Sequence, residues 1–226
     1  MQLLFDQADA CHRAETLLVW LPPAGARPEA FVEQGFVAAL RAAALPVDCA
    51  LAGVDDRWAM DCSAPAVVHE QVIRPARAAG YRQIWLAGIS LGAFNALHYA
   101  ARHAACLAGM FLLAPYPGTR DILLEIRAAG GPQAWATSAP ADMRDERIWW
   151  HWLVQQSHHD EWPVPVWYAS GDADRFAAGQ ALLAELLPQQ RVRHGPGGHE
   201  WAVWLRLWRE TLAEGRLFQA AGRTQP

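Results

Sequence analysis

The sequence of 226 residues contains no lysine, and all 19 of its basic residues other than histidine are arginine. Function classes that depend on a lysine side chain are therefore excluded. These are P-loop nucleotide binding, Schiff-base chemistry with pyridoxal phosphate, and Ser–Lys nucleophilic catalysis. Phosphoryl transfer that holds ATP through a strand lysine is excluded for the same reason. Any serine nucleophile in this chain must use a base other than lysine.

Other features are scarce as well. No apolar run approaches the ~18 residues needed to cross a bilayer, and residues 1–13 lack the basic start of a secretory signal peptide. A net charge of −4 gives no electrostatic footprint for nucleic acid. The four cysteines have no paired spacing, which favours free thiols over a disulfide framework or a metal cluster. We therefore expect a cytoplasmic protein with no nucleic-acid or membrane partner, and the oligomeric state is left open.

Apolar runs alternate with longer amphipathic segments along most of the chain. The pattern predicts strands at 16–21, 47–54, 83–89, 107–114, 164–170 and 190–194, and helices at 31–45, 65–79, 91–103, 177–187 and 201–213. Continuous apolar strands separated by helices indicate an α/β fold, in which a mostly parallel, doubly wound sheet is covered on both faces. The length fits one domain over residues 1–226.

The segment at about 118–162 interrupts this alternation. Two helix-like pieces, 120–129 and 147–157, flank a stretch rich in Gly, Pro and Ala, which exceeds what a crossover between parallel strands needs. We therefore predict a small helical cap or lid insertion. Side chains 149 to 152 cannot all face one side of a helix, so some tryptophans of this segment are candidates for a substrate pocket. Packing of the lid on the core is the alternative for these residues, which are Trp135, Trp149, Trp150 and Trp152.

The strongest chemical signal is the sequence Gly88-Ile89-Ser90-Leu91-Gly92, which ends a predicted strand and directly precedes a predicted helix. A serine on such a sharp turn has a strained backbone and an exposed hydroxyl, and small residues two positions before and after leave room for the turn. The helix N-terminus would also face negative charge that forms near the serine. We interpret Ser90 as a nucleophile, with a glycine-rich packing turn as the alternative.

An acid and a base follow later strands. Asp174 lies shortly after the strand at 164–170, where the carboxyl ends of parallel strands meet, and it is the preferred acid over Asp172. The pair Asp55-Asp56 follows an earlier strand and is a weaker candidate. His199 follows a glycine-rich loop and precedes a helix. A histidine on such a loop can reach the edge of the sheet where Ser90 lies, so we interpret His199 as the base. Nucleophile, acid and base in this chain order are one of three orders that unrelated folds use.

From about residue 16 to residue 208, the chain resembles the α/β-hydrolase superfamily. The resemblance implies an oxyanion loop after the first predicted strand, where this chain reads Leu21-Pro22-Pro23-Ala24-Gly25 instead of a His-Gly-x-Gly-like sequence. Proline has no N–H, so the predicted backbone donors are Ala24 and Leu91, the residue after the serine. The sequence Gly198-His199-Glu200-Trp201 resembles the esterase-D-like and carboxylesterase branches, whereas the proline-containing loop resembles type II thioesterases.

The resemblance implies a serine hydrolase that cleaves a carboxylic ester of small or medium acyl size through an acyl-enzyme, with Ser90, His199 and Asp174 as its triad. An acyl thioesterase and a non-catalytic binding protein of the same fold are the alternatives. No metal or organic cofactor is expected. The run 158–161 (HHDE) lacks the spacing of helical metal ligands. The expected partner is therefore a small-molecule ester or thioester, of unspecified identity and acyl length.

Overall fold

The computed structural model describes residues 1–137, 145–159 and 162–218. Within them, the strands form one sheet in the order β1-β3-β2-β4-β5-β6-β7. Only β1 runs antiparallel, against β3, and every other neighbouring pair is parallel. The strands are β1 (Leu3–Asp6), β2 (Thr16–Leu21), β3 (Val47–Ala52), β4 (Gln83–Ile89), β5 (Gly109–Leu113), β6 (Val166–Gly171) and β7 (Val192–Gly195). The predicted mostly parallel sheet is confirmed.

All six predicted strands are present, and their ends differ from the prediction by at most two residues. The edge strand β1 was not predicted. It has four residues of alternating burial, and it pairs Leu3 with Ala52 and Asp6 with Cys49. A segment this short, with its apolar Leu3 and Phe5 exposed, carries little of the hydrophobic signal that identifies the central strands.

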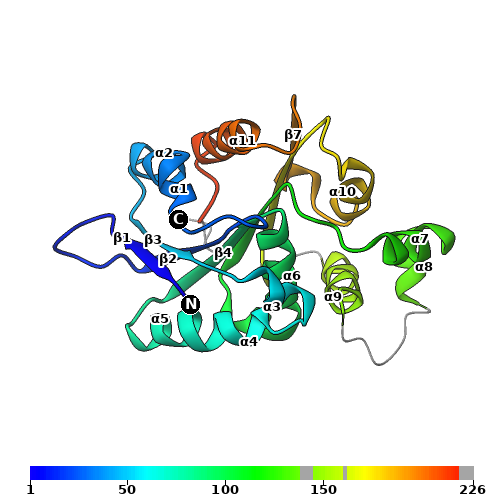
Figure 1. The fold of residues 1–226 in the computed structure, drawn as a ribbon, viewed down its shortest axis with the longest axis horizontal. Coiled ribbons are helices and arrows are strands. Elements are labelled where there is room, and N and C mark those ends of the chain that lie inside the picture. Colours follow the sequence, from blue (N-terminus) through cyan, green and yellow to red (C-terminus); the bar gives the residue numbers. More distant parts are fainter. Residues whose placement is uncertain (138–144, 160–161, 219–226) are drawn as a thin grey trace.

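Helices cover both faces of the sheet (Figure 1). One face is covered by α1 (Ala30–Glu33), α2 (Phe36–Ala42) and α11 (Trp201–Ala213), whose core includes the fully buried Trp208. The opposite face is covered by α3 (Asp56–Met60), α4 (Ala64–Val68), α5 (Arg74–Ala78), α6 (Leu91–His103) and α10 (Ala177–Ala184). The central strands are buried on both faces, which explains why they are continuous apolar runs.

Two predicted helices are interrupted. The segment 31–45 forms α1 and α2, separated at Gly35, whose φ of +85° lies in the left-handed region. The segment 65–79 forms α4, a π-helical turn η1 (His69–Ile73) and α5. Pro75 in the first turn of α5 provides no N–H for a helical hydrogen bond to the preceding turn. Short 3₁₀ turns, η2 (Ala104–Cys106) and η3 (Gln189–Arg191), precede β5 and β7.

Among the described residues between β5 and β6, in the segment for which a cap was predicted, there are three helices. They are α7 (Arg120–Ala128), α8 (Pro132–Ala136) and α9 (Arg147–Ser157). Figure 1 shows α9 beside α6, with α7 and α8 farther out near α10. In the described ranges, none of the helices combines the length and apolar character needed to span a membrane. The four cysteines are free, and Cys49 is the one fully buried.

Candidate active site

Ser90 lies on the sharp turn between β4 and α6, with φ of +52° and ψ of −113°. The turn requires glycine on both sides. A Cβ at Gly88 would lie 2.3 Å from the carbonyl carbon of Gly92, and one at Gly92 would lie 2.0 Å from the carbonyl oxygen of Leu21. Both contacts involve backbone atoms that cannot move aside without disturbing β2 or α6. The steric reason for the glycine spacing is therefore confirmed.

The strained turn is held by backbone hydrogen bonds to three neighbouring segments. The Ser90 amide donates to the Leu113 carbonyl over 3.0 Å, and the Ser90 carbonyl accepts from the amides of Phe94 and Tyr116, both over 3.1 Å. A non-glycine residue at positive φ costs about 1–3 kcal/mol, and such strain persists where surrounding contacts over-determine it. The sheet and α6 thus fix the direction of the Ser90 side chain.

Ser90, His199 and Asp174 form one hydrogen-bonded chain. The Nε2 atom of His199 lies 2.9 Å from Ser90 Oγ, and its Nδ1 atom lies 2.7 Å from Asp174 Oδ2. An ionised carboxylate can only accept, so Nδ1 of His199 donates to it. In the neutral imidazole, Nε2 is then the acceptor for the Ser90 hydroxyl. The structure therefore brings together the three predicted residues in the geometry of a nucleophile, a base and an orienting acid.

Asp174 follows β6 and is 4% exposed. Burial alone would raise its pKa, but hydrogen bonds from His199 and from the Phe176 amide, the latter over 2.8 Å, favour the carboxylate. The net effect holds the pKa of Asp174 below its ordinary value. A negative charge is therefore kept beside His199, where it stabilises an imidazolium ion.

The competing acids lie elsewhere. Asp172 is exposed, and its amide donates to the carbonyl of Gly195 over 2.8 Å. Asp55 accepts from the amide of Arg57 at the start of α3 and forms an ion pair with that side chain. Asp56 accepts from the Gly25 amide at 3.0 and 3.3 Å. The hypothesis of a displaced acid at 55–56 is therefore wrong, because these carboxylates contact a helix start and a loop instead of His199.

In the first part of the loop after β2, residues 22–26, one amide has no acceptor among the described residues. Pro22 and Pro23 have no N–H, the Gly25 amide donates to Asp56, and the Ala26 amide donates to the carbonyl of Pro23. Within the described part of the chain, the amides of Ala24 and Leu91 have no hydrogen-bond acceptor. Leu91 is the first residue of α6, where an amide has no partner inside the helix. These are the two amides predicted as oxyanion donors.

Ser90 and His199 open into a cleft of about 590 Å³. One wall is the segment from the β2 end to α1, and the other is the start of α11. The residues that line it are Pro23, Ala24, Gly25, Ala26, Ala30, Glu33, Gln34, Ser90, Arg175, His199, Glu200, Trp201 and Trp204. A cleft of this size accommodates a small ligand next to the Ser90 hydroxyl.

Several residues of this site were not predicted. Trp201 and Trp204 at the start of α11 both line the cleft, and Trp204 also belongs to the core beneath it. The ring of Trp204 is nearly perpendicular to that of His199 with centroids 4.8 Å apart, and the ring of Phe176 is nearly perpendicular to it at 5.0 Å. Trp208, farther along α11, is fully buried in the core, and its Nε1 donates to the Phe36 carbonyl. The position of Trp201 and Trp204 directly after His199 was the available signal.

The four tryptophans of the 118–162 segment do not line this cleft. Trp149 and Trp150 are fully buried and stack with centroids 4.8 Å apart, while Trp135 and Trp152 are 4% and 8% exposed. Trp150 Nε1 donates to the Pro117 carbonyl over 3.1 Å. All four belong to the core that α9 shares with α6. The interpretation as substrate-pocket residues is corrected to core packing, because all four side chains are buried in this core and none of them lines the cleft.

In the described ranges, no group of three or more His, Cys, Asp and Glu side chains is arranged to hold a metal ion. Of the run 158–161, residues 160 and 161 lie outside those ranges.

The sheet order, the strained serine turn and the Ser–His–Asp chain define a protein with the α/β-hydrolase fold. No family model matches the sequence, and no curated protein matches it. Solved structures do match, and they include FphF, a fluorophosphonate-binding serine hydrolase of Staphylococcus aureus, with a TM-score of 0.65 and 13% identity over 94% of this chain and 91% of that one. Est1E of Butyrivibrio proteoclasticus matches with a TM-score of 0.64 and 16% identity over 95% and 92% of the two chains. At these identities, the likeness shows the fold.

Proposed function

We propose that this protein is a serine hydrolase that cleaves a carboxylic ester through an acyl-enzyme, with Ser90, His199 and Asp174 as its catalytic triad. The observation that carries the proposal is the continuous hydrogen-bonded chain from Asp174 through His199 to Ser90 at the floor of an open cleft. The names of structural neighbours, which include a ferulic acid esterase and an S-formylglutathione hydrolase, support ester or thioester chemistry.

The first half of the reaction forms the acyl-enzyme. Ser90 Oγ attacks the substrate carbonyl carbon while His199 Nε2 accepts the hydroxyl proton. Negative charge then develops on the carbonyl oxygen, where the amides of Ala24 and Leu91 donate hydrogen bonds to it. Loss of one such donor typically raises the barrier by about 2.7–4 kcal/mol. The imidazolium ion passes its proton to the leaving oxygen, and the alcohol departs.

The second half repeats these steps with water. His199 removes a proton from a water molecule, the hydroxyl attacks the acyl carbon, and Ser90 leaves with the proton returned by His199. Asp174 stays ionised and stabilises the imidazolium in both halves. The products are a carboxylic acid and an alcohol, and no cofactor takes part in the proposed mechanism.

A fluorophosphonate probe tests the nucleophile, because only an activated serine reacts with it. The wild type is expected to be labelled and to hydrolyse p-nitrophenyl hexanoate, whereas Ser90→Ala loses both properties. Ser157→Ala is the matched control, since this hydroxyl bonds only to the Val154 carbonyl within α9. Labelling that persists in Ser90→Ala would refute the proposal. A folded wild type that is never labelled would also refute it, and would favour a non-catalytic binding protein.

An acyl thioesterase would use the same triad, so the leaving group must be tested separately. Hexanoyl-CoA and p-nitrophenyl hexanoate present the same acyl chain on a thiol and on a phenol. A higher kcat/KM for the oxygen ester supports an esterase, and the opposite order reassigns the enzyme to thioesters.

A further inference from the structure

We propose that the substrate carries an anionic group, a carboxylate or a phosphate, remote from the scissile carbonyl and bound by Arg120 and Arg127. The inference rests on the proposed function, because it assigns a specificity site next to the same serine. The site is a second pocket of about 380 Å³, which lies along α7 and is lined by Tyr116, Gly118, Arg120, Leu123, Leu124, Arg127 and Phe176.

One stripe of α7 forms the cationic wall of this pocket. Arg120, Leu123, Leu124 and Arg127 have the i, i+3, i+4, i+7 spacing that places them on one helix face. Within the described residues, Arg120 has no acidic partner, and the Arg127 side chain makes one hydrogen bond, from Nη2 to the Ala178 carbonyl over 3.1 Å. Two guanidinium groups that flank exposed leucine surface suit an anion with an apolar chain.

The α7 pocket and the catalytic cleft have different lining residues, but two residues of the α7 pocket contact the Ser90–His199 pair. Phe176 lines the pocket, and its ring also contacts the His199 ring in a perpendicular arrangement with centroids 5.0 Å apart. Tyr116 lines it as well, and its amide donates to the Ser90 carbonyl. The Arg175 guanidinium lies 4.8 Å from the Phe176 ring centroid and lines the catalytic cleft. Arg175 and Phe176, which are adjacent in the chain, thus line the catalytic cleft and the α7 pocket respectively, and the inference places the substrate along this pair from Ser90 toward α7.

The opposite side of the catalytic cleft carries the opposite charge. Glu33 of α1 and Glu200 before α11 both line that cleft, and neither has a basic partner within the described ranges. A substrate anion directed toward this wall would meet two unneutralised carboxylates, which costs free energy. The same anion directed toward α7 meets Arg175 first and then Arg120 and Arg127. The acidic wall on one side and the arginines on the other thus favour a bound substrate whose anionic group points toward α7.

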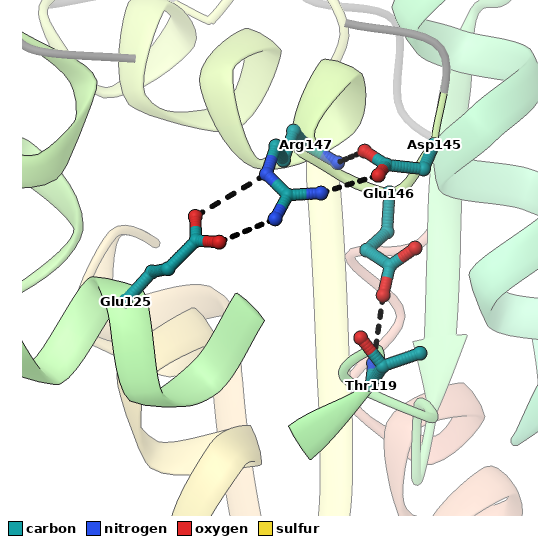
Figure 2. A network of polar contacts seen from close by, with 5 residues as sticks. All are labelled: Thr119, Glu125, Asp145, Glu146 and Arg147. Atoms are coloured by element: carbon teal, nitrogen blue, oxygen red, sulfur yellow. Dashed lines mark hydrogen bonds and ion pairs between the residues drawn. The ribbon is translucent and has the colours of Figure 1, made fainter. Parts of the chain in front are cut away.

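Two acidic residues near α7, Glu125 and Glu146, are each held by a neighbour, but within the described residues Glu146 has no basic partner, and it lies close to Gly118 of the pocket. Figure 2 shows Glu125 bound by Arg147, which also binds Asp145, and the buried Glu146 accepting from the Thr119 amide over 2.8 Å. Glu125 is therefore neutralised by α9, and the start of α7 is fixed in place. The remaining acid of the helix, Asp121, is not among the residues that line the pocket.

Two matched substrate pairs test the proposal. Mono-p-nitrophenyl adipate and p-nitrophenyl hexanoate differ by a carboxylate at the end of the acyl chain. The hexanoates of 4-(carboxymethyl)phenol and 4-ethylphenol differ by a carboxylate on the leaving group. We expect kcat/KM roughly tenfold higher for the anionic member of one pair, since a charge-assisted hydrogen bond of ordinary strength gives about that factor. The pair that responds identifies which part of the substrate enters the α7 pocket.

Arginine variants connect the preference to the pocket. Arg120→Gln and Arg127→Gln should each reduce the preference for the anionic substrate to about onefold. Arg82→Gln is the matched control, because Arg82 is exposed and precedes β4 at the sheet edge opposite Ser90. Competitive inhibition by adipate and by butyl phosphate then shows whether a carboxylate or a phosphate fits better. Thermal melting of the Arg127 variant checks that α7 stays packed on α10.

The outcomes separate this inference from the proposed function. If Ser90-dependent hydrolysis is present but neither pair shows an anion preference, the specificity site is refuted and the serine hydrolase stands. An anion preference that survives in Arg120→Gln and Arg127→Gln also refutes it. If no ester or thioester is hydrolysed, the proposed function fails first, and the inference fails with it.

Discussion

Asp174 illustrates how one side chain acquires its role from its surroundings. Asp172 and Asp174 follow the same strand and differ little in sequence context, but only Asp174 is buried and bonded to His199. Since hydrogen bonds hold the pKa of Asp174 below its ordinary value, the carboxylate persists throughout the neutral range. By linkage, its stabilising contribution is present above the unfolded-state pKa and is lost as the pH falls through the lower folded-state pKa.

Asp174→Asn is therefore expected to lower kcat by about 10³–10⁴-fold, because the amide can hold His199 in the wrong tautomer. The difference in unfolding free energy between wild type and variant should shrink as the pH is lowered from 7 through the ordinary range of an aspartate. Kinetics at pH 7.5 and urea titrations at two pH values measure both effects. Asp172→Asn is the control and should keep wild-type kcat; a larger loss in that variant would reverse the assignment of the acid.

At the scale of elements, the loop after β2 is held by α3. The Asp56 carboxylate in the first turn of α3 accepts from the Gly25 amide, and the adjacent Ala24 amide is left free toward the cleft. Asp56 is thus a positioning residue for a proposed oxyanion donor. Its carboxylate can be replaced by an amide that keeps the acceptor oxygen.

We expect Asp56→Ala to lower kcat roughly tenfold with little change in KM, since a misplaced donor weakens transition-state binding more than ground-state binding. Asp56→Asn should restore most of kcat, because its side-chain oxygen can still accept from the Gly25 amide. Steady-state kinetics of both variants with p-nitrophenyl hexanoate provide the test. Equal losses in both would mean that the charge, and not the hydrogen bond, is what matters.

The helix α6 carries a buried histidine that the proposed mechanism does not use. His98 is fully buried, and its ring meets the Phe94 ring edge-on at 4.7 Å. Burial lowers the pKa of His98, and Arg102, Glu146 and Asp145 are the charged groups nearby. The native state therefore favours neutral His98, while the unfolded chain binds the proton readily. Such a group makes the protein less stable as the pH falls below the ordinary pKa of 6.5.

His98→Leu should flatten this dependence. We expect the unfolding free energy of the wild type to fall between pH 7.5 and pH 5 with a His98 contribution of up to about 1.4 kcal/mol per pH unit. The variant should lose that contribution and keep its stability at pH 7.5 within about 1.5 kcal/mol, as for a swap of similar volume. Urea titrations of both proteins across this range measure the slopes. Parallel slopes would show that His98 is solvated or protonated in the native state.

For the molecule as a whole, the sequence predicted those features that depend on neighbouring residues in the chain, such as the serine turn and the central strands. The sharp turn at Ser90 requires glycines within a stretch of five residues, 88–92, so the sequence of that stretch was enough to predict it. The central strands were predictable because they are buried on both faces and are therefore continuous apolar runs. The α7 pocket could not be predicted from the sequence. Arg120 and Phe176 lie on different elements, and only the packing of these elements brings the two side chains to the same pocket. The direction of Trp149 and Trp150 was missed for the same reason: their spacing on α9 fits either a pocket or a core, and only the contact with α6 decides.

That contact predicts that α9 does not open as a separate lid. Trp149, Trp150 and Leu153 are fully buried in the core that also holds Phe94 and Leu97 of α6. Exposing two such tryptophans uncovers roughly 300–500 Å² of mostly apolar surface, which at about 25 cal/mol/Å² costs on the order of 10 kcal/mol. This cost is comparable to the whole stability of an ordinary domain, about 5–15 kcal/mol. Opening α9 is therefore nearly as expensive as unfolding the protein.

Hydrogen exchange measured by mass spectrometry tests this expectation. Peptides covering α9 should show protection within about tenfold of those covering α6, because both helices exchange through the same global opening. The edge strand β1 is the internal reference for fast local exchange, since Leu3 and Phe5 are 40% and 51% exposed. If α9 exchanges as fast as β1, the helix opens locally and the segment acts as a lid. Protection equal to that of α6 instead shows that α9 stays packed on the core, so that access to the cleft does not depend on an opening of α9.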